Sequence, residues 1–126
     1  MKNRIFAGVP SEDIAGYARA VVDGSTIHVS GVTGRDPVSG DFPEQADEQA
    51  RNCLAAIDTS LRQAGASLEN AVVCRVYVVD QASAAAVTPV LGEIFADIRP
   101  TNTMLICQIP AAGAKVEIEI TASTAA

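Results

Sequence analysis

Residues 115–122 read KVEIEITA, and acidic and apolar side chains alternate along them. Successive side chains of a β-strand point to opposite faces, so Glu117 and Glu119 share one face and the apolar residues between them share the other. We predict a strand over Lys115–Thr121. By themselves the two carboxylates are most simply a solvated strand face. If that face meets another subunit, a partly desolvated carboxylate there would be suited to acid–base chemistry.

Other segments have the composition of strands. Ala71–Val79 is rich in β-branched residues, which favour strands. Short apolar runs separated by turn residues predict antiparallel hairpins. We expect one hairpin from Tyr17–Val22 and Thr26–Ser30 around Asp23-Gly24-Ser25, a further strand at Arg4–Ala7, and a second hairpin from Thr103–Ile109 and Lys115–Thr121.

Two segments have helical periodicity. Between Glu44 and Gln63 the apolar residues recur every three or four positions, and a second helix follows with Thr88 as N-cap and Pro89 at its first position. Gly31–Pro43 contains too many glycines and prolines for a regular element and is predicted to be a loop. This order of elements predicts an α+β fold in which both helices cover one face of a mixed sheet.

The second face of that sheet has nothing to cover it. With the alternation above, it would carry Val73, Tyr77, Val79, Met104 and Ile106 among polar neighbours. Large exposed apolar patches mark interfaces, so we expect a homo-oligomer with ligand sites at the seams between subunits.

Length and composition restrict the class of protein. A chain of 126 residues with 48% hydrophobic residues is one domain, residues 1–126. A net charge of −6 without a basic run argues against nucleic-acid binding, and no apolar run is long enough for a membrane span. The first ten residues have no signal-peptide core and the three cysteines form no CxxC motif, so we expect a cytoplasmic protein with reduced thiols.

The sequence has none of the common motifs for a bound cofactor. Zinc-ligand spacing, a P-loop, a GxSxG elbow and a dinucleotide fingerprint are all missing, so we expect neither a metal nor an organic cofactor. The single histidine, His28, has no local pattern of a catalytic triad around it and is expected to be an ordinary structural or surface residue.

Four segments, in this order and spacing, resemble the reactive intermediate (imine/enamine) deaminase family RidA, also called the YjgF or L-PSP endoribonuclease family. They are GYARAVVDGSTIHVSG (16–31), QARNCLAAIDTSLRQAGASLENAVVCRVYVVD (49–80), IRPTNT (98–103) and KVEIEITA (115–122). The resemblance implies a chorismate-mutase-like α+β fold of the bacillus type. It also implies a homotrimer around a central barrel, with three clefts between subunits.

Carried over by position, the resemblance implies a cleft lined by Tyr17, by the backbone of Gly31 and by Glu117, which would hold a water molecule. We take Glu117 and Tyr17 as candidate catalytic residues. The family's deaminases have an arginine two residues after the proline of the Arg-Pro dipeptide, where this chain has Asn102. An asparagine cannot grip a carboxylate through a charged fork. Two residues later, Met104 replaces a cysteine.

These departures define the candidate substrate-binding residues. A 2-imino acid should bind poorly beside Asn102, unless Arg19, which should share a strand face with Tyr17, serves as a relocated anion anchor. Phe95 and Met104 are expected to be walls of the site.

The leading hypothesis is hydrolysis of a small imine, enamine or related C=N compound at an intersubunit cleft. The alternative is a trimer that binds a small metabolite without turnover, for regulation or partner docking. Ribonuclease activity, suggested by the family's older name, is opposed by the negative charge.

Overall fold

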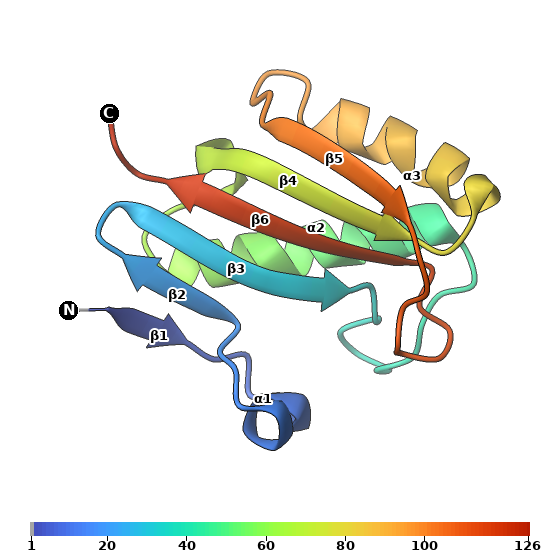
Figure 1. Ribbon diagram of the computed structural model, residues 1–126, viewed down its shortest axis with the longest axis horizontal. Helices are drawn as coiled ribbons and strands as arrows, with labels where there is room; N and C mark the ends of the chain where they lie inside the picture. Colours follow the sequence, from blue (N-terminus) through green and yellow to red (C-terminus); the bar gives the residue numbers. More distant parts are fainter. Residues whose placement is uncertain (1) are drawn as a thin grey trace.

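The computed structural model describes residues 2–126, which form a six-stranded mixed sheet with helices on one side (Figure 1). The strand order is β1-β2-β3-β6-β4-β5, and all neighbours are antiparallel except β4 and β5. The strands are β1 (Asn3–Ile5), β2 (Ala20–Asp23), β3 (Thr26–Thr33), β4 (Ala71–Val78), β5 (Thr101–Ile106) and β6 (Val116–Ser123).

The last strand, β6, lies in the middle of the sheet between β3 and β4. Its even-numbered residues from Val116 to Ala122 are almost completely buried, whereas the odd-numbered residues between them are half-buried. The predicted alternation is therefore confirmed, and Glu117 and Glu119 lie together on the face opposite the core.

The first predicted hairpin is confirmed and the second is wrong. β2 and β3 are antiparallel, with Asp23 opposite Thr26. β5, however, pairs in parallel with β4 at the sheet edge and makes no ladder with β6. Parallel neighbours need a crossover, and the helix between β4 and β5 provides it. β6 can then fill the central position, where its fully apolar face is covered.

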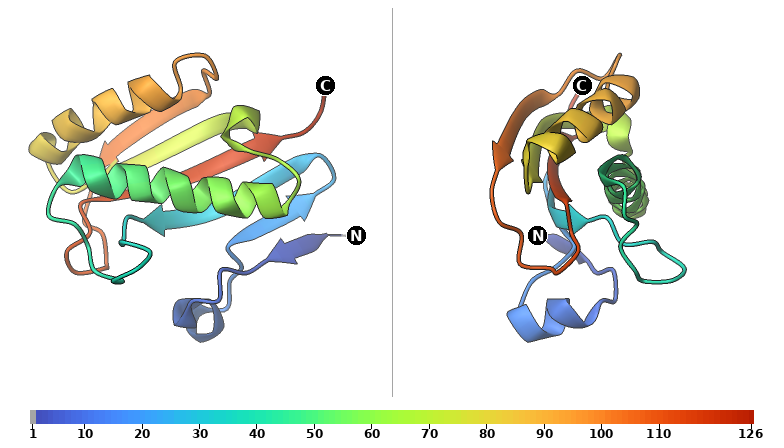
Figure 2. Two further views of the ribbon diagram at one scale, coloured as in Figure 1. Left: turned by 180° about the vertical axis from the view of Figure 1, so that it is seen from behind. Right: turned by 90° about the vertical axis from the view of Figure 1, so that its right-hand side faces the viewer.

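The two predicted helices both cover one face of the sheet, as expected (Figure 2). They are α2 (Ala46–Gln63) and α3 (Gln81–Ile94). The predicted start of α3 at Thr88 and Pro89 is wrong. Asp80 is the N-cap, where its carboxylate accepts a hydrogen bond from the Ser83 backbone N–H at 2.7 Å, and Pro89 lies inside the helix. The Thr88 hydroxyl donates to the carbonyl of Ala84 at 2.8 Å.

Two short helices were not predicted: α1 (Pro10–Ala15) and the 3-10 turn η1 (Leu68–Asn70). Glu12 of α1 is buried, and its carboxylate accepts hydrogen bonds from the backbone N–H groups of Ala7 and Gly8, both at 2.9 Å. These bonds, first of all the one from Ala7, lower the pKa of Glu12. They fasten α1 to the segment that follows β1.

The strand predicted to start at Tyr17 begins at Ala20 instead. Gly16 has a left-handed backbone (φ 71°) that ends α1, and the Tyr17 N–H donates to the Glu12 carbonyl at 3.0 Å. Tyr17 and Arg19 therefore lie in the connection between α1 and β2.

Two predictions about sheet faces are also wrong. Strand alternation within Ala71–Val79 predicts Val72 on the same face as Cys74, Val76 and Val78. Val72 is instead 45% exposed, because β4 has an additional residue there, between the pairs Ala71–Ala122 and Val73–Thr121. Met104 and Ile106 were expected on the uncovered face. They pair with Val76 and Val78, whose side chains are buried in the core, and thus belong to the helix side.

The uncovered face still carries apolar side chains. Val73 and Tyr77 are half-buried there, and Leu105, which pairs with Tyr77, is 53% exposed.

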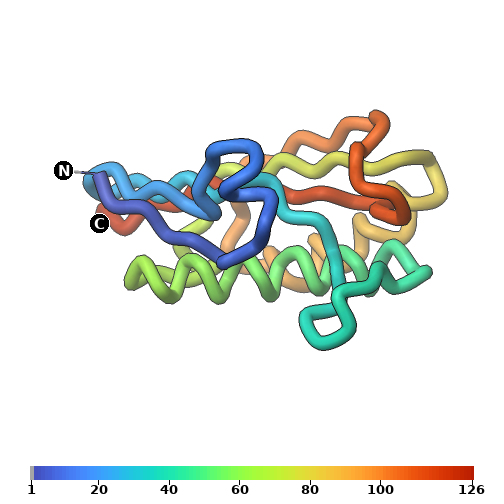
Figure 3. The backbone as a smooth tube through the Cα atoms, turned by 90° about the horizontal axis from the view of Figure 1, so that it is seen from below, coloured from blue at the N-terminus to red at the C-terminus, as the bar shows by residue number. Residues whose placement is uncertain are grey.

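A buried amide connects the two long loops at one end of the sheet. Gln49 of α2 is fully buried; its amide donates to the carbonyls of Pro43 (2.7 Å) and Gly113 (3.0 Å) and accepts from the Lys115 N–H (2.8 Å). Gly34 lies against the Gln49 backbone so closely that a Cβ atom would collide with it. The loop that begins there projects on the helix side of the sheet (Figure 3).

Among residues 2–126, no helix combines the length and the apolar composition that a membrane crossing requires.

We predict that Gln49→Met lowers the free energy of unfolding by about 2–4 kcal/mol, because it removes three part-buried hydrogen bonds and leaves two carbonyls and one N–H without this partner. Urea denaturation followed by circular dichroism measures the loss. Gln63→Met at the exposed end of the same helix is the matched control and should change stability little. An equally small effect of Gln49→Met would contradict a stabilising role for the hydrogen bonds of the Gln49 amide.

Candidate active site

Glu117 lies over an irregularity in the neighbouring strand. Between the pairs Val29–Ile120 and Val32–Ile118, β3 has two residues where β6 has one, which is a β-bulge. Gly31 belongs to this bulge, and a Cβ atom added to it would collide with the Glu117 carboxylate, whose carboxyl carbon would lie at 3.0 Å. Only glycine therefore allows the Glu117 carboxylate to take this position.

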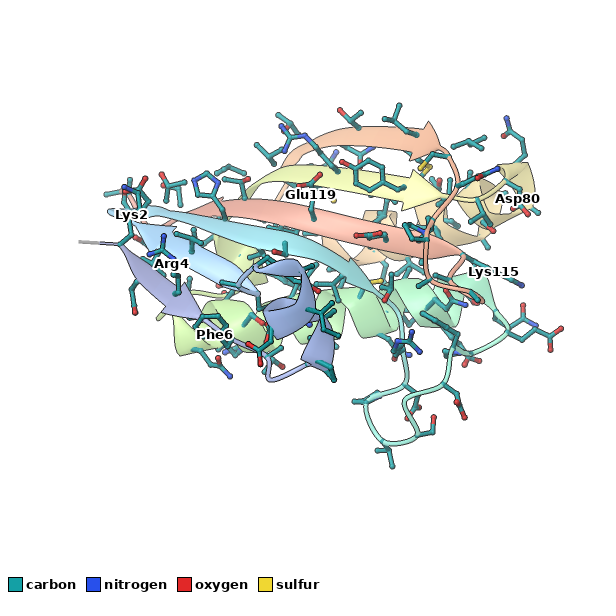
Figure 4. All side chains as sticks on the ribbon, turned by 60° about the horizontal axis from the view of Figure 1, so that its bottom comes forward. Lys2, Arg4, Phe6, Asp80, Lys115 and Glu119 are labelled. Carbon is teal, nitrogen blue, oxygen red and sulfur yellow. The ribbon has the colours of Figure 1, made fainter. Side chains whose placement is uncertain are left out.

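The surroundings of Glu117 favour its neutral form. Burial raises its pKa above 4.5, and the negative charge of Glu119 raises it further. Glu119 projects from β6 on the side of the sheet away from α2 (Figure 4) and accepts a hydrogen bond from the Tyr77 hydroxyl. That bond raises the pKa of Tyr77. A cavity of about 290 Å³ adjoins this carboxylate pair and is also lined by Gly31 and Cys107.

Tyr17 and Arg19 line a second cavity, of about 480 Å³, which Gly31 borders as well. The Tyr17 ring is 39% exposed, and its hydroxyl shares a hydrogen bond with that of Ser11 at 2.6 Å. Gly31 is thus common to the cavity of Tyr17 and the cavity of Glu117, so one chain brings these three predicted residues to the same part of the sheet.

Asn102, Met104 and Phe95 line a third cavity, between β5 and the C-terminal end of α3, of about 450 Å³. Asn102 pairs with buried Cys74 and therefore points to the helix side of the sheet. Phe95 caps the end of α3, is only 7% exposed and forms part of the floor.

One chain does not bring the two groups of predicted residues together. Tyr17, Gly31 and Glu117 border cavities beside β3 and β6, whereas Asn102 and Met104 face α3 from β5 at the sheet edge. The strand β4 lies between β6 and β5, and Glu117 lies on the opposite face from Asn102 and Met104.

Sequence reasoning missed Arg99 as a site residue. It lines the cavity of Asn102, and its φ of 55° makes it the only residue other than glycine with a left-handed backbone among residues 2–126. The Arg-Pro dipeptide at Arg99 and Pro100 was the available signal, but its backbone conformation cannot be read from the sequence.

The described part of the chain contains no group of three or more His, Cys, Asp or Glu side chains that could hold a metal ion. Two of the cysteines are ordinary core residues: burial raises the pKa of Cys53 to about 12 and that of Cys74 to about 11. Cys107, also in an apolar stretch of sequence, is exposed.

Comparison with known proteins connects this geometry to a family. The family model described as Endoribonuclease L-PSP matches residues 10–124. The chain belongs to this family, the YjgF/RidA family. A 2-iminobutanoate/2-iminopropanoate deaminase of Capra hircus is 33% identical over 84% of this chain and 78% of its own. The RutC family protein y4sK of Sinorhizobium fredii is 33% identical over 82% of each chain.

Solved structures of the YjgF/RidA family share the fold. A crystal structure of a YjgF/YER057c/UK114 family member from Mycobacterium tuberculosis has a TM-score of 0.89 and 33% identity, and the match covers 98% of this chain and 100% of that one. Yeast Mmf1, at 19% identity, has a TM-score of 0.83 over 98% of each chain. The expected chorismate-mutase-like α+β fold is thereby confirmed.

We predict an unusual titration for this YjgF/RidA family member. The pKa of Glu117 lies above that of an unfolded glutamate, so the native state holds the proton more tightly and stability falls as pH rises from about 4.5 through the raised value. Carboxyl ¹³C NMR titration measures the pKa directly, and Glu117→Gln should flatten this part of the stability–pH curve.

The control for the cause of the shift is Glu119→Gln. Removing the Glu119 charge should bring the pKa of Glu117 down in part, while burial, the larger cause, keeps it above 4.5. A Glu117 that titrates like a free glutamate in the unmodified protein would contradict this description.

Proposed function

We propose that the protein hydrolyses small reactive imines or enamines at clefts between the subunits of a homotrimer built around a central barrel. Each cleft would combine Tyr17, Gly31 and Glu117 of one copy with Asn102, Met104 and Phe95 of the next. The observation that carries the proposal is the half-buried Glu117 carboxylate with a raised pKa above Gly31, next to cavities that a second copy can close.

Assembly is supported by the two groups of site residues in one chain. Glu117 lies on the uncovered face near the centre of the sheet, whereas Asn102 and Met104 lie on the helix side of the edge strand β5. The edge strand of one copy could therefore bring its residues to the central strands of the next. Val73, Tyr77 and Leu105 leave apolar surface on the uncovered face, which subunit contact would bury.

The proposed reaction consumes water as the only other reactant and releases ammonia and a carbonyl compound. Glu117 in its neutral form first gives its proton to the imine nitrogen. A water molecule hydrogen-bonded to the resulting carboxylate attacks the carbon of the protonated C=N group, and the electron pair of the C=N π bond moves to nitrogen. Glu117 takes a proton from the water and passes it to that nitrogen. The Glu117 carboxylate then takes the proton of the new hydroxyl group as the C=O bond forms and the C–N bond breaks, and ammonia leaves. Tyr17 would form a wall of the cleft, and the Asn102 amide would orient the substrate.

Asn102 affects which substrates the proposed cleft accepts, whether or not it turns them over. Asn102 has no charge, so its hydrogen bond to a substrate carboxylate would be weaker than that of an arginine at the same position. A trimer that binds a small metabolite without turnover has the same cleft, and only turnover distinguishes the two functions.

We expect the purified protein to accelerate hydrolysis of freshly generated imines, measured as faster disappearance of the semicarbazide-trapped imine and faster ammonia release. Glu117→Gln should lower the rate by about 10²–10⁴-fold, the usual contribution of general acid–base catalysis. Glu48→Gln, an exposed carboxylate on α2, is the matched control. The panel must contain anionic and neutral imines, and no acceleration of any of them would rule out the hydrolase. Asn102→Arg adds a second criterion: gain of 2-imino acid hydrolysis indicates a competent site, and continued inactivity indicates a binding protein.

Subunit mixing tests whether two copies form one site. Glu117→Gln disables one half of the cleft, and Asn102→Trp fills the cavity that forms the other half. Each variant alone should be inactive. After unfolding together in equal amounts and refolding, about a quarter of the clefts in a random trimer contain two intact halves, so activity should return. A mixture that stays inactive, or a monomer by light scattering, would contradict the shared cleft.

A further inference from the structure

The cavity beside α3 has an apolar floor and one charged residue at its rim. Leu91, Phe95 and Cys74 are buried at its base, and Met104 is half-buried. Arg99 is the only charged residue that lines it. A cavity with this lining fits a small molecule with an apolar substituent and a negative group.

The backbone of Arg99 is unfavourable for an arginine. Its φ of 55° is left-handed, which a residue with a Cβ atom adopts at a cost and glycine adopts freely. Pro100 follows it and restricts the conformation of the preceding residue further. The turn alone would be better served by glycine, so the side chain of Arg99 needs another explanation. Strained residues of this kind cluster at ligand sites.

The Arg99 side chain is held at one nitrogen and open at the other two. Its Nε–H donates to the Ala96 carbonyl at 2.6 Å, which fixes the start of the guanidinium group. Neither terminal nitrogen forms a hydrogen bond or an ion pair within residues 2–126. A guanidinium group held in this way presents two parallel donors, the geometry that a carboxylate accepts.

Arg19, the other candidate anion anchor, is less available. Its positive charge helps to lower the pKa of the nearby Glu12 carboxylate. The negative charge of Glu12 therefore already offsets part of the attraction of Arg19 for an anionic ligand. Arg19 also lines the cavity of Tyr17, not the cavity of Asn102. No acidic residue lines the cavity of Arg99.

We propose that Arg99 is a specificity-determining residue that binds the carboxylate of an anionic imine whose bulky apolar substituent lies on Leu91, Phe95 and Met104. The proposal rests on the proposed function and names the substrate class of the same cleft. Asn102, on the same rim, would donate a neutral hydrogen bond to the same carboxylate. The volume of about 450 Å³ exceeds what an acid of three or four carbons fills, so an aromatic or branched substituent is favoured.

Binding of stable product analogues tests Arg99 without requiring turnover. The probes are phenylpyruvate, its neutral methyl ester and pyruvate, each titrated by isothermal calorimetry. We expect phenylpyruvate to bind at least about tenfold more tightly than either of the others, because only it has both the charge and the ring. Arg99→Gly should remove the preference over the ester and leave the affinity for the ester unchanged. Arg99→Lys, which keeps the charge but not the fork, should retain part of it.

Thermal unfolding separates this role from a structural one. Arg99→Gly relieves the left-handed backbone, so its melting temperature should stay equal or rise while the preference is lost. Equal binding of phenylpyruvate and its ester, no binding of phenylpyruvate, or a preference unaffected by Arg99→Gly would each overturn the proposal. The imine panel shows which of the two proposals fails. If hydrolysis depends on Glu117 but Arg99 gives no preference for the anionic ligand, only the role of Arg99 is ruled out. If Arg99 gives that preference but no imine is hydrolysed, only the proposed enzymatic activity is ruled out.

Discussion

The central position of β6 is the constraint on which the rest of the structure depends. Its buried residues from Val116 to Ala122 pack against α2 on one side, and the alternation of a strand then requires Glu117 and Glu119 to lie on the other. A carboxylate in the middle of a sheet is costly unless something compensates for its lost hydration. Here the Tyr77 hydroxyl donates a hydrogen bond to Glu119. The bulge in β3 and the glycine within it only make room for Glu117, whose raised pKa reflects the cost of its burial.

The second constraint is that the edge strand β5 pairs with β4 and not with β6, the next strand along the chain. Because β6 occupies the centre, β5 can pair only with the outer side of β4, and the crossover helix α3 sets it parallel. This arrangement turns Asn102 and Met104 toward α3 and away from Glu117. The same pairing that completes the core thus divides the candidate site between two parts of the chain.

Local patterns predicted most elements but not their pairing. The alternation of β6, the period of α2 and the turn at Gly24 were sufficient to place those elements, because each depends on neighbouring residues. The face of Met104 depends on which strand β5 joins, and the additional residue at Val72 depends on the register with β6. Both are long-range properties. The start of α3 was predicted wrongly at Pro89 for a related reason. Packing tolerates a proline inside this helix, although local propensity disfavours it.

The site residues could be chosen from the resemblance, but their electrostatics could not. That Glu117 is half-buried follows from the sheet around it, and the open donors of Arg99 follow from one hydrogen bond to Ala96 and an unfavourable φ. Asn102 by itself gives the cavity no charge. Arg99 lies three positions earlier in the chain and lines the same cavity, so a guanidinium group is present there. The charge of this cavity is therefore a property of its whole lining, and the residue at a single position does not determine it.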